Sequence, residues 1–77
     1  MGEYATDDEF NGSVNDTLRQ ATVATGVSGT LQAQAGGTWV NVPDGALVGP
    51  TNITFYQPRG QVMRFTGVTG GKVYVSG

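Results

Sequence analysis

The chain has 77 residues, 13 of them glycine, with a net charge of −2 and neither cysteine nor histidine. This length allows one domain at most. Without cysteine there is no disulfide framework and no thiolate metal site, and without histidine there is no nucleophile–base pair built on that residue. Many glycines and few charged residues are typical of a turn-rich all-β protein. No apolar run approaches the ~18 residues of a transmembrane helix, so we expect no membrane partner.

Residues 1–16 carry five acidic residues and no basic one. Large apolar residues are sparse there and do not alternate with polar ones, so the segment buries too little surface to offset its ordering entropy. The sequence therefore predicts an extended acidic N-terminal arm over residues 1–16, followed by a β-body over residues 17–77. This arm is either a disordered tail or a segment held by something else, with Tyr4 and Phe10 as its anchors.

The body contains short β-rich runs separated by turn signals. Period-two alternation on both sides of Gly36-Gly37 indicates a β-hairpin, because glycine adopts positive φ without a Cβ clash. Several such runs at short spacing predict an all-β fold, a small antiparallel β-sandwich or barrel of about six short strands. Residues 43–51 show no alternation and are predicted to form a loop that plugs one end. The predicted strands cover residues 17–24, 30–35, 38–42, 52–57, 61–66 and 72–76.

Alternation within these runs assigns one set of residues to the core and another to the opposite faces. The faces opposite the core then carry Trp39, Tyr56, Val62 and Tyr74, and such a group of large exposed residues indicates an interface. These residues could instead close a second small core over the 43–51 loop. The predicted core consists of Leu31, Ala33, Val40, Val42, Leu47, Ile53, Phe55, Met63, Phe65, Val73 and Val75.

The sequence offers little for catalysis, because five of the six acidic residues lie in the predicted arm, where they cannot hold a fixed geometry. We therefore expect no enzyme, no cofactor and no metal site. Arg59, Arg64 and Lys72 form too thin a basic footprint to predict nucleic-acid binding. An alternative is a small carbohydrate-binding module in which Trp39, Tyr56 and Tyr74 share one sheet face and stack on sugar rings.

The small core and the open strand edges predict a partner. A domain of this size without disulfides or metal gains stability by association, and an unpaired sheet edge has to be covered or paired. We therefore expect self-association or attachment to a larger assembly. The candidate partner-binding residues are Tyr4, Phe10, Trp39, Tyr56 and Tyr74.

Three segments carry a recognisable pattern of turns and strands. They are Gly-Thr-Leu-Gln-Ala-Gln at 29–34, Gly-Thr-Trp-Val-Asn-Val at 37–42, and Gly-Gln-Val-Met-Arg-Phe-Thr-Gly-Val-Thr-Gly-Gly-Lys-Val-Tyr-Val at 60–75. This pattern resembles small β-sandwich virion structural proteins of tailed bacteriophages, which include capsid decoration (cement) proteins, head-fibre bases and head–tail adaptors.

The resemblance implies a capsid decoration protein, made in the host cytoplasm and located on the capsid surface of the virion. It implies that the chain binds the major capsid protein or other virion subunits and self-associates as a homotrimer. A tail- or fibre-associated adaptor is the alternative within the same group. The pattern marks fold positions, so the resemblance carries over no individual functional residue.

Overall fold

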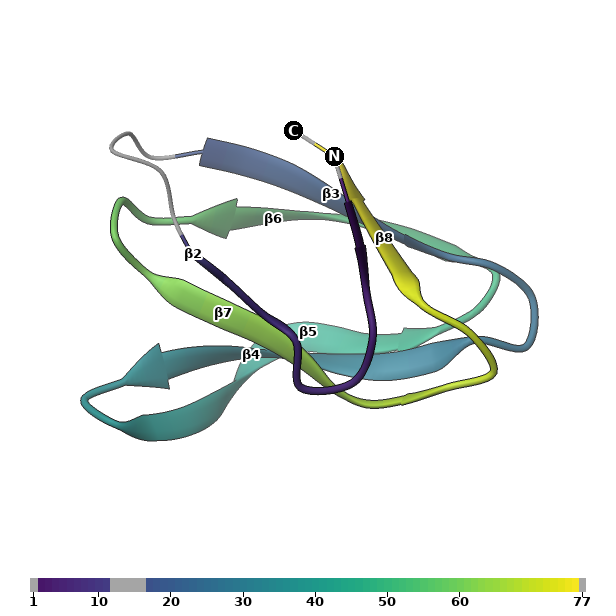
Figure 1. Cartoon of the computed structure of the whole chain (residues 1–77). Helices are drawn as coiled ribbons and strands as arrows, with labels where there is room; N and C mark the ends of the chain where they lie inside the picture. Colours follow the sequence, from purple (N-terminus) through teal and green to yellow (C-terminus); the bar gives the residue numbers. More distant parts are fainter. Residues whose placement is uncertain (1, 12–16, 77) are drawn as a thin grey trace.

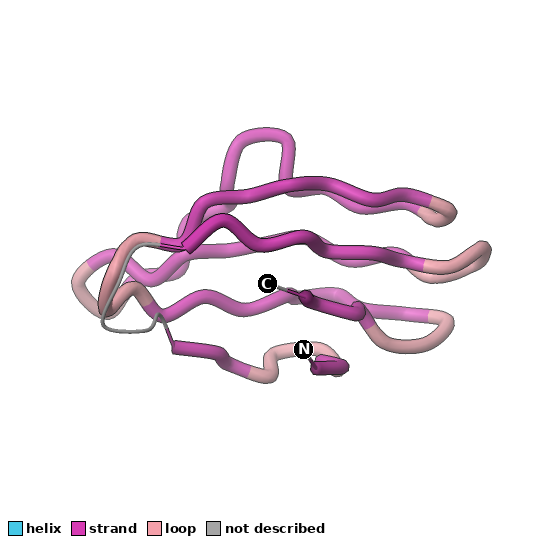
Figure 2. Tube along the Cα trace, turned by 90° about the horizontal axis from the view of Figure 1, so that it is seen from above, coloured by secondary structure: helices cyan, strands magenta, loops and turns pink. Residues whose placement is uncertain are grey.

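The computed structural model describes residues 2–11 and 17–76, which form eight strands and no helix. The strands pack as two four-stranded antiparallel sheets, one above the other in Figure 1, and short turns join most of them (Figure 2). This arrangement confirms an all-β antiparallel fold and shows it to be a sandwich. The strands are β1 (Gly2–Tyr4), β2 (Glu9–Asn11), β3 (Thr17–Val23), β4 (Ser28–Ala35), β5 (Thr38–Val48), β6 (Thr51–Gln57), β7 (Val62–Thr69) and β8 (Val73–Ser76).

The two sheets are built from strands that are distant in sequence. Sheet A has the order β1-β8-β3-β6, and sheet B has the order β2-β7-β4-β5. Each of the six predicted runs overlaps one of the strands β3 to β8. The first and last strands along the chain, β1 and β8, are neighbours in sheet A, so the N-terminal and C-terminal strands lie side by side.

The predicted hairpin is present as β4 and β5, which pair up to the closing pair Ala35 and Thr38. Gly36 and Gly37 form the two-residue turn, with φ of 58° and 90°. Positive φ at both positions is the requirement of a type I′ turn, whose twist matches that of the flanking strands. Gly-Gly therefore fixes this turn and the register on both sides of it.

The core lies between the sheets and contains most of the residues that alternation assigned to it. Val40 is the exception at 51% exposed, because it lies near the tip of the β4–β5 hairpin, which Figure 1 shows beyond the ends of β3 and β6. Ala33, Val42 and Ile53 are partly buried against the core. The predicted core residues that are buried are Leu31, Leu47, Phe55, Met63, Phe65, Val73 and Val75; those that alternation did not assign are Phe10, Ala21, Val23 and Val27.

The prediction of a separate N-terminal arm is wrong for residues 2–11; residues 1 and 12–16 lie outside the described part. β1 pairs with β8 at the edge of sheet A, and β2 pairs with β7 at the edge of sheet B. The segment crosses from one sheet to the other and closes one side of the sandwich (Figure 1). Local composition suggested an arm because Glu3, Asp7, Asp8 and Glu9 are exposed. The strands with which the segment pairs could not be recognised locally, since they lie more than fifty residues away along the chain.

A buried glutamine ties this N-terminal segment to the body. The Gln57 side chain is 0% exposed, and its Nε2 donates hydrogen bonds to the carbonyl oxygens of Phe10, at 3.2 Å, and Gln61, at 2.9 Å. A buried carbonyl without a donor costs free energy, so this amide holds β2, the end of β6 and the β6–β7 turn in one arrangement.

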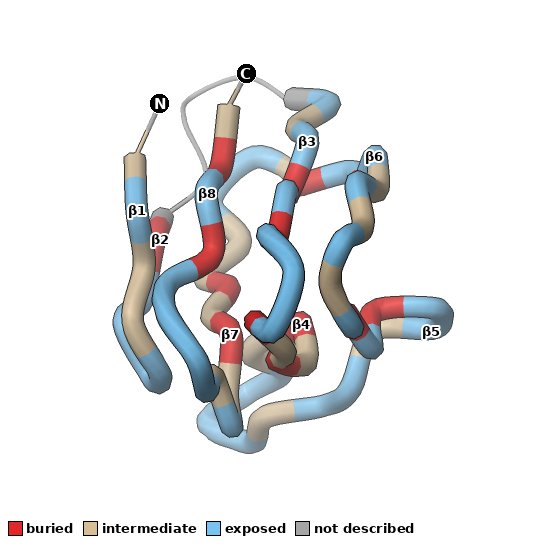
Figure 3. Tube along the Cα trace, turned by 90° about the vertical axis from the view of Figure 1, so that its right-hand side faces the viewer, coloured by how far each residue is buried: buried red, intermediate tan, exposed pale blue. Residues whose placement is uncertain are grey.

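The prediction of a loop over residues 43–51 is wrong for most of its length, because β5 continues to Val48 and buries Leu47. The pairing with β4 moves from Asn41–Gln32 to Ala46–Thr30, so residues 42–45 lie opposite Leu31 alone. We call residues 42–45 the β5 excursion. Pro43 supplies no backbone donor and Asp44 has a φ of 59°, so the ladder is interrupted here, and Figure 3 shows β5 standing out from the side of the sandwich.

Candidate interaction surfaces

The five candidate partner-binding residues occupy three different places. Phe10 is buried in the core and Tyr4 is packed against it. Tyr56 and Tyr74 lie on β6 and β8 of sheet A, whereas Trp39 lies on β5 of sheet B. Trp39 and the two tyrosines therefore do not share a sheet, and the expected platform of three aromatic rings on one face is wrong.

Phe10 and Tyr4 belong to an aromatic cluster inside the sandwich. The Phe10 ring centroid lies 4.9 Å from that of Tyr4, 5.6 Å from Phe65 and 6.2 Å from Phe55. Rings at these separations interact favourably beyond the area that they bury. These two residues thus hold the N-terminal strands to the body, with Phe10 buried and Tyr4 partly buried.

The outer face of sheet A is the surface that turns away from the core. The buried residues of β3, β6 and β8 alternate with exposed ones, as the colours of β3 and β8 show in Figure 3. The register aligns the exposed side chains into rows, for example Leu18 beside Tyr56 and Thr22 beside Tyr74. The outer face of sheet A consists of Glu3, Leu18, Gln20, Thr22, Asn52, Thr54, Tyr56, Tyr74 and Ser76.

This face combines large apolar side chains with a near absence of charge. Leu18 is 67% exposed, Tyr56 50% and Tyr74 40%, while Glu3 is its single charged member. Depletion of charge and enrichment in tyrosine distinguish the cores of protein–protein interfaces from the remaining surface. Leu18 was absent from the sequence-based candidates, although alternation with the buried Ala21 and Val23 along the predicted strand places it on this face.

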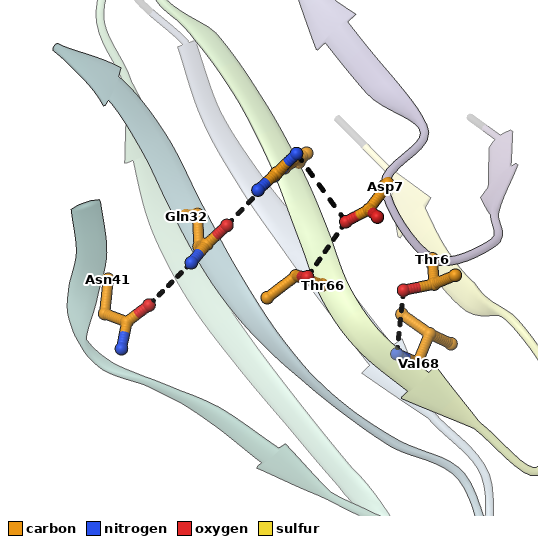
Figure 4. A network of polar contacts seen from close by, with 7 residues as sticks. Thr6, Asp7, Gln32, Asn41, Thr66 and Val68 are labelled. Atoms are coloured by element: carbon orange, nitrogen blue, oxygen red, sulfur yellow. Dashed lines mark hydrogen bonds and ion pairs between the residues drawn. The ribbon is translucent and has the colours of Figure 1, made fainter. Parts of the chain in front are cut away.

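The outer face of sheet B is polar and crossed by a chain of side-chain contacts (Figure 4). Gln32 Nε2 donates to Asn41 Oδ1 at 2.8 Å, and Arg64 Nε donates to Gln32 Oε1 at 2.9 Å. The Arg64 guanidinium also lies over the Trp39 ring, 4.2 Å from its centroid. A cation on the ring face is attracted by the ring quadrupole, so Trp39 is engaged within its own sheet.

The same chain of contacts continues to the turn between β1 and β2. Asp7 Oδ1 lies 3.6 Å from Arg64 Nη1 and accepts a hydrogen bond from Thr66 Oγ1 at 2.8 Å. The Asp7 amide donates to the Phe65 carbonyl at 2.7 Å, and the Val68 amide donates to Thr6 Oγ1 at 3.2 Å (Figure 4). These contacts fix the turn against β7, so Asp7, one of the acids of the N-terminal segment, contributes to the fold.

The described surface offers neither a pocket nor a cluster of metal-ligating side chains. Residues 2–11 and 17–76 form no pocket and bring together no group of three or more acidic, histidine or cysteine side chains that could hold a metal ion. Among these residues there is also no helix long and apolar enough to cross a membrane. The features that the described surface offers are the outer faces and the strand edges.

Comparison of the chain with protein-family models, with curated proteins and with solved structures found no match.

Proposed function

We propose that this chain is a non-enzymatic structural protein of a phage virion, a capsid decoration protein that binds the major capsid protein and stabilises the assembled particle. The observation that carries the proposal is the exposed apolar group on the nearly uncharged outer face of sheet A. The resemblance of residues 29–76 to small virion β-sandwich proteins suggests the kind of partner.

The outer face of sheet A suits docking for two physical reasons. Its tyrosines supply large contact areas with few rotatable bonds, so ordering them at an interface costs little entropy. Removing this face from water requires almost no ion desolvation, because Glu3 alone among its residues is charged. Leu18 and Tyr56 are neighbours in the register and form the centre of the proposed contact.

The mechanism is passive stabilisation. A protein that binds the assembled shell and not the free subunits shifts the equilibrium toward the shell by mass action. Many copies on one shell, each held by a modest contact area, together raise the stability of the whole particle.

The test is co-sedimentation of the purified chain with assembled capsids of the phage that encodes it, and with unassembled capsid subunits. We expect the chain to sediment with capsids and to raise the temperature at which they dissociate. Leu18→Asp should weaken binding about tenfold or more, since interface anchors contribute roughly 2 kcal/mol.

The matched control is Val48→Asp. Val48 is 72% exposed, and it lies on β5 of sheet B, away from the proposed contact. Equal losses of binding in both variants, or binding of the wild-type chain to neither form of the capsid protein, would refute the proposal. Binding to tails or fibres in place of capsids would select the adaptor alternative, which uses the same face.

A further inference from the structure

The strand β6 forms an unbroken sheet edge. It pairs with β3 through seven consecutive residues, from Thr51–Val23 to Gln57–Thr17, with no shift in register. Among the described strands β3 is its only neighbour in sheet A. A strand of this length presents about 23 Å of continuous edge.

The other three edges carry the devices that keep sheet edges from pairing. The strands β1 and β2 have three residues each, and β2 begins with the charged Glu9. The strand β5 is long, but Pro43 and the β5 excursion interrupt it. The β5 excursion stands out on the side of the sandwich where β5 and β6 both lie (Figure 3), so it interrupts the edge of sheet B, and a second chain at the β6 edge has to leave room for it.

The strand β6 carries none of these devices. Its sequence, Thr-Asn-Ile-Thr-Phe-Tyr-Gln, contains no charged residue, no proline and no glycine, and most of its residues are β-branched or aromatic. Short segments of high β-propensity and no charge are the ones that pair with added strands. Three of the four sheet edges are protected against pairing and the β6 edge is not, which indicates that the β6 edge pairs with another strand.

We propose that β6 is a self-association edge, at which a second copy of this chain adds its own β6 in antiparallel orientation about a two-fold axis at Thr54. The register then pairs Thr54 with the partner's Thr54, Ile53 with the partner's Phe55 and Asn52 with the partner's Tyr56. Two four-stranded sheets become one continuous sheet of eight strands.

The sequence of β6 is compatible with this self-pairing. Reversal about Thr54 keeps core-facing residues opposite core-facing residues, because a pairing about one central residue preserves the two-residue period. Ile53, which is only partly buried in the single chain, gains a cross-strand aromatic neighbour. No pair in the register places like charges opposite each other. A two-fold contact also uses both β6 edges, so the assembly closes at two chains.

The occupant is a second copy because β6 matches itself over its whole length in this register. The inference is independent of the proposed function, since it concerns the edge of sheet A, while capsid binding was assigned to its outer face.

Sedimentation equilibrium over a dilution series tests the proposal on the full chain. The wild-type mass should rise with concentration from 8.0 kDa to twice that value. Thr54→Lys and Thr54→Glu should each weaken dimerisation about tenfold or more, because like charges meet at the two-fold axis. An equimolar mixture of the two variants should dimerise again, since the central pair then has opposite charges.

The matched control is Gln20→Lys. Gln20 pairs with Thr54 on the same face but lies on β3, inside the sheet, so this variant should dimerise as the wild-type chain does. Amide hydrogen exchange in β6 should slow as the concentration rises.

A single-chain mass at every concentration, a trimer or open-ended fibres would overturn the proposal. It would also be overturned if the two Thr54 variants stayed monomeric when mixed, or if Gln20→Lys weakened association as much as Thr54→Lys. Because Thr54 also belongs to the outer face of sheet A, capsid binding is not read from its variants. A Leu18→Asp chain that loses capsid binding and still dimerises separates the two proposals.

Discussion

Replacing Phe10 by alanine should destabilise the whole sandwich, although Phe10 lies in a segment that looks detachable in the sequence. The side chain is 6% exposed and its ring lies within 6.2 Å of three other aromatic rings, measured between centroids. Truncation of a buried phenylalanine costs about 3–5 kcal/mol in transfer free energy and residual cavity. A chain of this length has a total stability of roughly 4–12 kcal/mol.

The loss therefore removes about a quarter or more of the free energy of unfolding and should lower the melting temperature by roughly 12–40 °C. The assay is equilibrium urea denaturation followed by circular dichroism and by the fluorescence of Trp39, the single tryptophan. Both probes should report the same transition, shifted to lower urea concentration with little change in slope.

Leu18→Ala is the control for Phe10→Ala. Leu18 is 67% exposed, so its truncation should change the free energy of unfolding by about 0.5 kcal/mol or less. If Phe10→Ala also cost less than about 1 kcal/mol, residues 2–11 would not complete the core, and the sequence-based prediction of a separate arm would be restored.

Two further substitutions test contacts that join separate segments of the chain, the hydrogen bonds of Gln57 and the close approach of Gly70 to Gly26. Gln57→Leu removes the donor to the buried Phe10 carbonyl and to the part-buried Gln61 carbonyl, and should cost about 1–3 kcal/mol in the same assay; an unchanged midpoint would contradict the role given to this amide. Gly70→Ala should cost about 2–5 kcal/mol, because φ at Gly70 is 78° and a Cβ there would strike the carbonyl of Gly26. Gly36→Ala, at a φ of 58° with open space around it, should cost only about 1–2 kcal/mol, and equal costs at the two glycines would rule out the close approach.

Part of the outer face of sheet A could be predicted from alternation along single strands, and part could not. Tyr56 and Tyr74 could be placed on an outer face from alternation alone, since neighbouring residues of a strand point to opposite sides. Leu18 follows from the same rule once its strand is aligned with the buried Ala21 and Val23. That Trp39 belongs to the other sheet could not be predicted, because sheet membership depends on which distant strands pair.

The sequence by itself determined that strands occur at the positions of β3 to β8, apart from the second half of β5, together with the Gly36-Gly37 turn and most of the core. Alternation and turn chemistry act between residues close along the chain, which is why they could be predicted. Only the tertiary structure decided that residues 2–11 contribute two strands to the sandwich. Their strands gain hydrogen bonds and a hydrophobic site from β7, β8 and the Phe55–Phe65 cluster, all of which lie far away in sequence. The β5 excursion and the open edge of β6 were decided in the same way, since an edge exists only once the neighbours of every strand are fixed.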